Sequence, residues 1–167
     1  GGDLLYRWGN PRAWSAGTQK DQKLFNPHDA HWIPAGLPGA GNVLLFNNGQ
    51  TLTRHDYSPV DELVLPLTDT QTYTRDSNQP YSPLKPSWSF KDPGRLFSPR
   101  ISGAQRLPGG NTLICSGSQF LVLEVTSGGD IVWIYRNPPR FTNPGSARNP
   151  LPSPADLPSE KLDAIRI

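Results

Sequence analysis

The sequence lacks methionine, contains a single cysteine and has no long apolar run. One cysteine excludes an intrachain disulfide, and Cys115, inside the apolar run 113–115, is expected to be a small buried side chain. No stretch approaches the roughly 18 apolar residues of a membrane-spanning helix, so no membrane span is predicted. The 16 basic and 14 acidic residues form no basic cluster, so nothing in the charge pattern favours nucleic acid as a partner.

Residues that form turns are abundant instead. The chain has 19 prolines and 16 glycines, which interrupt it every few residues, so its elements must be short. Such a composition is typical of β-structure with many turns and irregular loops. Five Trp, five Tyr and six Phe, with clusters of Leu, Ile and Val, supply a core. We therefore expect an all-β fold.

Internal repeats give the organisation. Residues 2–11 and 129–138 both begin with Gly-Asp, continue through apolar and aromatic residues and end in Asn-Pro. A second pair, residues 30–34 and 104–108, leads in each copy to a Gly-Asn turn and an apolar strand. A repeat of about 40 to 45 residues with four strands is the period of a β-propeller blade.

Each copy is predicted to contribute four antiparallel strands. The later copy has tight Gly-rich turns between its strands, and the earlier copy has longer loops over residues 11–27, 48–57 and 66–86. The expected strands of the later copy cover residues 102–107, 112–116, 120–126 and 130–136. Those of the earlier copy cover residues 29–33, 43–47, 58–65 and 87–90.

The predicted fold is a β-propeller fragment. It comprises one domain over residues 1–138, with an outer strand of a preceding blade at 2–8, one blade at 28–91 and a second at 100–137. An extended Pro-rich tail, with a short helix near 159–165, follows over residues 139–167. Closed propellers have about four to eight blades. Two blades would leave apolar faces bare, so additional propeller blades or other protein chains are expected as partners.

Several motifs resemble the bacterial arylsulfotransferase family. They are His-Asp-Ala-His-Trp at 28–32, Phe-Asn-Asn-Gly at 46–49, Ser-Pro-Val-Asp-Glu at 58–62 and Leu-Pro-Gly-Gly-Asn-Thr-Leu at 107–113. The resemblance covers about residues 2–138. It implies an exported protein, periplasmic or extracellular, with a six-bladed propeller. It also implies sulfuryl transfer from a phenolic sulfate ester to a phenol, without a nucleotide sulfate donor or any other cofactor.

The family's chemistry relies on histidines and an arginine beside the central channel. His28 matches a family histidine and Arg54 is the nearest match to the arginine, so both are catalytic candidates. A neutral imidazole can act as nucleophile or base, and a guanidinium offers a planar fork to sulfuryl oxygens. Trp32 could stack on a phenol ring, and His55 could orient a catalytic group, which makes both substrate-binding candidates.

Plainer interpretations stay open. His28 and His31 are expected on opposite strand faces, so no metal site is predicted. The position in the later copy that matches His28 carries Ser102, so the histidine that accepts the sulfuryl group is not located. Glu62 is expected to be structural. The alternative function is a non-catalytic set of propeller blades that serves as a binding or assembly module.

Overall fold

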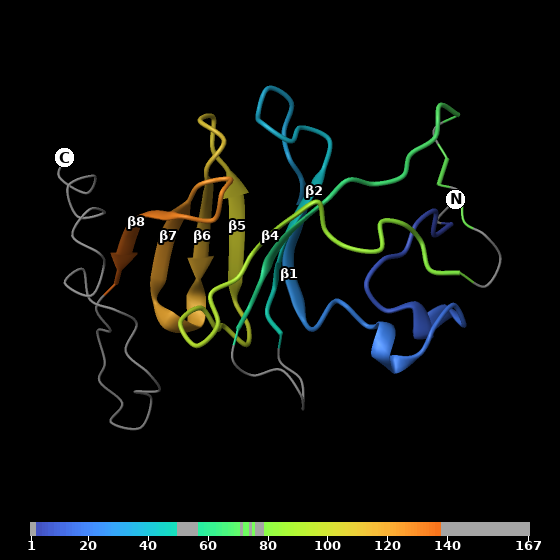
Figure 1. The fold of residues 1–167 in the computed structure, drawn as a ribbon, viewed down its shortest axis with the longest axis horizontal. Coiled ribbons are helices and arrows are strands. Elements are labelled where there is room, and N and C mark those ends of the chain that lie inside the picture. Colours follow the sequence, from blue (N-terminus) through green and yellow to red (C-terminus); the bar gives the residue numbers. More distant parts are fainter. Residues whose placement is uncertain (1–2, 50–56, 71, 74, 76–78, 138–167) are drawn as a thin grey trace.

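The computed structural model describes residues 3–49, 57–70, 72–73, 75 and 79–137. These residues form two four-stranded antiparallel sheets, and each sheet has its strands in chain order (Figure 1). The first sheet contains β1 (Pro27–Trp32), β2 (Val43–Asn47), β3 (Val60–Leu63) and β4 (Trp88–Phe90). The second contains β5 (Ser102–Arg106), β6 (Thr112–Ser116), β7 (Leu121–Val125) and β8 (Ile131–Arg136). The all-β prediction is confirmed for the described residues.

The outer strand of a preceding blade, predicted at 2–8, is not formed in this structure, and its assignment to another blade stays a prediction. Residues 3–8 form no strand, because no described strand lies beside them to take their backbone hydrogen bonds. Side chains anchor this segment instead: the Tyr6 hydroxyl donates to the Ser82 carbonyl at 2.6 Å, and the Trp8 indole donates to the Pro83 carbonyl at 2.6 Å. The segment continues into two short 3-10 helices, η1 (Pro11–Trp14) and η2 (Gln19–Asp21).

An aromatic cluster ties the N-terminal segment to the loop between β3 and β4. The Tyr6 ring lies 4.9 Å from that of Tyr73 and 5.1 Å from that of Tyr81, centroid to centroid. Both segments lie on the side of the first sheet that faces away from the second sheet (Figure 1). The first sheet is therefore flanked on both sides.

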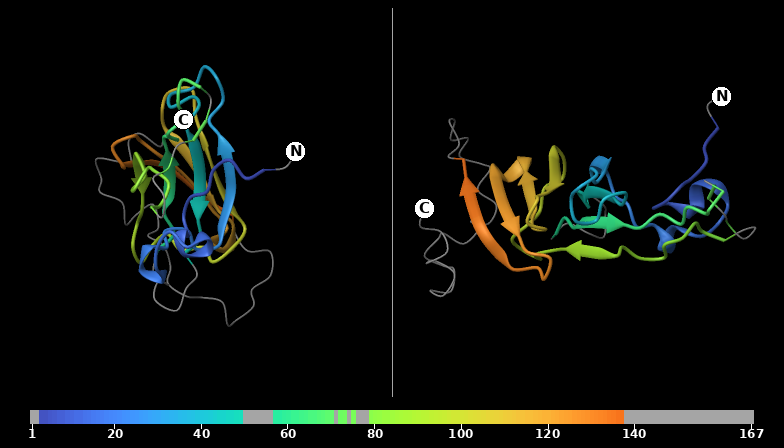
Figure 2. Two further views of the ribbon diagram at one scale, coloured as in Figure 1. Left: turned by 90° about the vertical axis from the view of Figure 1, so that its right-hand side faces the viewer. Right: turned by 90° about the horizontal axis from the view of Figure 1, so that it is seen from above.

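The two sheets share one hydrophobic core. β5 packs against β1 and β2, and the two sheets stand next to each other when the molecule is seen from above (Figure 2). The core contains mostly aliphatic side chains, which strands of this composition bury well. Its buried members are Ile33, Leu44, Phe46, Val60, Phe90, Leu96, Ala104, Ile114, Leu121, Leu123 and Val125.

A buried ion pair crosses this interface. The Arg106 guanidinium of β5 donates to the Glu62 carboxylate of β3 and lies 5.3 Å from the ring centroid of Trp88. The Trp88 indole in turn donates to the carbonyl of Ser127 in the β7–β8 turn, at 2.8 Å. The expectation that Glu62 is structural agrees with these contacts.

The first strands of the two sheets, β1 and β5, are joined by a second polar contact. The Asp29 carboxylate accepts a hydrogen bond from the Ala104 amide at 3.1 Å. A Cβ at Gly103 would lie 2.5 Å from the same carboxylate, so a larger residue there would displace the Asp29 side chain from the Ala104 amide.

The helices of the described residues are short. With η3 (Gly117–Gln119) they comprise three 3-10 turns of three or four residues, and none could cross a membrane. The predicted tail over 139–167, with its short helix near 159–165, lies outside the described residues.

Candidate functional site

His28 is the second residue of β1 and is half-buried. Its Nδ1 lies 2.8 Å from Oδ1 of Asn48 and 3.3 Å from the carbonyl oxygen of Asn26. Both partners are acceptors, so Nδ1 must carry the proton. In the neutral imidazole Nε2 then has a lone pair, and no described residue hydrogen-bonds to it.

The orientation of Asn48 is itself fixed. Its side-chain nitrogen donates to the Ser98 carbonyl at 2.6 Å, which leaves Oδ1 for the histidine. The Ser58 hydroxyl donates to the Asn48 carbonyl at 2.6 Å and accepts from the Ser98 amide at 2.9 Å. Asn48, Ser58 and Ser98 are all buried, so a satisfied polar network holds the residue that sets the tautomer of His28.

His31 does not lie where the sequence predicts. His28 is paired with Phe46 and His31 with Leu44, so three steps along β1 match two along β2. The extra residue is a β-bulge, and Asp29 within it has a positive φ of 54°. Because Leu44 and Phe46 share a face of β2, the prediction of opposite faces for the two histidines is wrong.

Of the other predicted site residues, only Trp32 lies among the described residues, and it is not close to His28. Trp32 is 55% exposed at the far end of β1, four residues from His28, a distance of roughly 13 Å along a strand. Arg54 and His55 lie outside the described residues, so their roles stay predictions.

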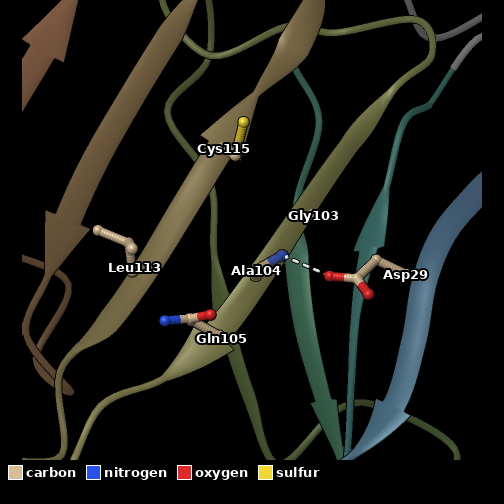
Figure 3. Close-up of a pocket in the computed structure, with 6 residues that line it drawn as sticks. All are labelled: Asp29, Gly103, Ala104, Gln105, Leu113 and Cys115. Atoms are coloured by element: carbon tan, nitrogen blue, oxygen red, sulfur yellow. Dashed lines mark hydrogen bonds between the residues drawn. The ribbon is translucent and has the colours of Figure 1, made fainter.

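An open pocket lies beside the junction of β1 and β5 (Figure 3). It is lined by Asp29, Gly103, Ala104, Gln105, Leu113 and Cys115. The Asp29 carboxylate is held by the Ala104 amide, and the described residues contain no group of three metal-ligating side chains. Within that part of the chain, the pocket offers one carboxylate and one thiol as reactive groups.

Sequence reasoning missed the part played by Asn48. The signal was the Asn-Asn-Gly turn, which was used only as a motif of the resemblance. Its first asparagine bonds the N-terminal segment, since Asn47 donates to the Lys23 carbonyl at 2.9 Å, and its second directs His28. Two consecutive asparagines at the end of a buried strand therefore indicate a positioned histidine in this protein.

The structure thus provides a histidine with a defined tautomer at the start of β1, next to the contact between two sheets. Comparisons with family models, curated proteins and solved structures found no match to this chain.

Proposed function

We propose that the chain supplies two neighbouring blades of a larger arylsulfotransferase-like β-propeller, which moves a sulfuryl group from a phenolic sulfate ester to a phenol. The observation that supports this best is the imidazole of His28, whose Nδ1–H is committed to Asn48 and whose Nε2 is available. An oriented imidazole of this kind can take a proton from a phenol and return it.

The step we assign to His28 is proton transfer. As the acceptor phenol's oxygen forms its bond to sulfur, Nε2 takes the phenolic proton, and the bond from sulfur to the leaving group breaks with its electron pair. The resulting imidazolium is stabilised by Asn48 Oδ1, which accepts from Nδ1–H. The sulfuryl-accepting histidine of the family belongs to other blades in this proposal, because Ser102 occupies the matching position in the second sheet.

The remaining parts of the proposal come from the resemblance. Arg54 would bind the sulfuryl oxygens and His55 would contact the phenol in the assembled propeller, whereas Trp32, at the far end of β1, is not part of the proposed site. The protein would act outside the cytoplasm, in the periplasm or the extracellular space, with a phenolic sulfate ester as its ligand.

A transfer assay on the protein purified with its partner chains tests the assignment. The donor is 4-methylumbelliferyl sulfate, the acceptor is phenol, and released 4-methylumbelliferone is followed by fluorescence. His28→Ala should lower turnover by about 100-fold or more, the usual contribution of a general base. His31→Ala, on the same strand, is the matched control and should retain activity. Equal turnover in wild type and His28→Ala removes His28 from the mechanism.

One observation favours a second candidate, the non-catalytic assembly module. At the position that matches His28, the Ser102 hydroxyl lies 3.4 Å from the Arg100 carbonyl and accepts from the Gly117 amide at 3.3 Å. Ser102 therefore stabilises a loop at the position where the first sheet carries its candidate catalytic histidine. Absence of turnover in the purified assembly, with the partners still bound, would support this function.

A further inference from the structure

One face of the second sheet carries nearly the same residue types as the buried face of the first sheet. We use "outer face" for the side chains of the second sheet that point away from the first: Leu113, Cys115, Val122, Glu124, Trp133 and Tyr135. The face of the first sheet that meets the second carries Leu44, Phe46, Val60, Glu62, Trp88 and Phe90.

The two sets correspond strand by strand. In the first sheet Leu44 is opposite Glu62, which is opposite Trp88. In the second sheet a leucine, a glutamate and a tryptophan again stand opposite one another, at Leu113, Glu124 and Trp133. Two residues further along each strand, Phe46, Val60 and Phe90 correspond to Cys115, Val122 and Tyr135.

Among the described residues, only one of these faces is covered. Phe46 and Phe90 are 0% and 5% exposed, whereas Trp133 and Tyr135 are 37% and 49% exposed. Cys115 is also exposed, so its expected burial is wrong in this structure. The outer face thus exposes aromatic side chains at positions that, in the first sheet, form the core of the interface between the sheets.

The hydrogen bonds of the two matching glutamates indicate which group the outer face would bind. Asn42 donates to Oε1 of Glu62 at 2.6 Å, and Asn111 donates to Oε1 of Glu124 at 2.6 Å. The second oxygen of Glu62 accepts from Arg106, whereas no described residue hydrogen-bonds to the second oxygen of Glu124. The glutamate of the first sheet therefore has a cationic partner, and the matching glutamate of the second sheet has none among the described residues.

We propose that the outer face binds a further four-stranded blade that has an arginine at the register of Arg106. Its guanidinium would bond Oε2 of Glu124 and lie over the Trp133 ring, as Arg106 does with Glu62 and Trp88. A turn carbonyl equivalent to that of Ser127 would accept from the Trp133 indole. The proposal rests on the propeller architecture proposed above and is independent of sulfuryl transfer.

A second copy of this chain does not fit. The residue of the first sheet that matches Arg106 in the internal repeat is Trp32, which supplies no cation. Two outer faces packed against each other would bring two Glu124 carboxylates into one interface, which like-charge repulsion opposes. The complementary occupant is an arginine-bearing blade of different sequence.

A tandem insertion tests the proposal in the full chain. A copy of residues 91–135 is inserted between Tyr135 and Arg136, which reproduces the spacing that follows Phe90, and the copy carries Cys115→Ser. The native Cys115 then reports coverage of the outer face through its reaction with 5,5′-dithiobis(2-nitrobenzoate). The reaction should slow by about tenfold or more, because thiol reactivity requires access.

Substitutions in the inserted copy isolate the arginine. Arg106→Gln in the copy should restore most of the thiol reactivity, and combining it with Glu124→Gln should add little, since the two groups act as a pair. Gln105→Ala in the copy is the matched control on the opposite strand face and should leave protection intact. Full protection without the arginine would overturn the proposed cation.

If the inserted copy does not fold, two measurements on the chain without the insertion test the proposal. Glu62→Gln should lower the unfolding midpoint by about 4 °C or more, and Glu124→Gln by less than about 1 °C. Equal losses would mean that Glu124 serves within the chain and would overturn the proposal. Protection of Cys115 that rises with protein concentration, together with a dimeric mass, would overturn it in favour of a second copy.

Discussion

The two sheets have the same strand order and nearly the same pattern of opposite residues, yet they differ in what surrounds them. The first has the second sheet on one face and the N-terminal segment on the other side, and its connections are long. The second has short turns and one open face. The comparison teaches that the residues of a strand do not decide its burial: Phe46 and Cys115 occupy matching positions, and neighbours alone make one buried and the other exposed.

The largest effect should come from truncating a matching pair. Phe46→Ala removes a fully buried ring and should cost about 3–5 kcal/mol of unfolding free energy. Cys115→Ala, at the matching exposed position, should change it by less than about 0.5 kcal/mol. Urea unfolding followed by Trp fluorescence measures both. Comparable losses would show that the outer face is covered in the isolated chain.

The ion pair offers a second contrast. Arg106→Gln leaves the Glu62 carboxylate buried without its cation and should cost about 3–5 kcal/mol. Arg95→Gln breaks a pair with Asp92 that is exposed on the arginine side and should cost about 1 kcal/mol or less. Denaturant midpoints of the two variants at neutral pH give the comparison. A small loss for Arg106→Gln would mean that the ion pair contributes little to holding the sheets together.

The smallest effect concerns the aromatic cluster on the far side of the first sheet. Burial, and then the nearby Tyr73, raises the pKa of Tyr6 above its ordinary value near 10. The stability that this shift represents is present below about pH 10 and is lost as the pH rises toward the folded-state pKa. Tyr6→Phe should therefore cost about 1 kcal/mol at pH 8, through the lost hydrogen bond to Ser82, and less at about pH 10.5.

Trp8→Phe is the control for this pH dependence. It removes a hydrogen bond in the same region, to the Pro83 carbonyl, without removing an ionisable group. Its cost should be the same at both pH values. A Tyr6→Phe cost that does not shrink with pH would contradict the raised pKa.

The fold could be predicted largely from turns and repeats. β2 and β6 have the predicted bounds, because Gly-Asn turns precede both strands and their apolar residues need burial. Residues 3–8 were mispredicted because they share a sequence pattern with β8, and a pattern does not supply the neighbouring strand that a β-strand requires.

The candidate site was less predictable. His28 could be named from its motif, but its tautomer depends on Asn48, twenty residues away, whose own orientation depends on Ser98. The bulge at Asp29 adds one residue to β1, which no period-of-two pattern reveals, and it changes which histidines share a face. Contacts of this kind join segments that are far apart in the sequence, so local sequence patterns do not predict them.

The meeting of Asp29 with Gly103 limits how this protein can change by mutation. A side chain at position 103 collides with the carboxylate, whereas a smaller residue at position 29 opens the space. A larger residue at 103 therefore costs the hydrogen bond between Asp29 and Ala104 unless position 29 has changed first. A change at position 29 lowers the cost of a change at position 103, so the two positions are expected to change together during evolution.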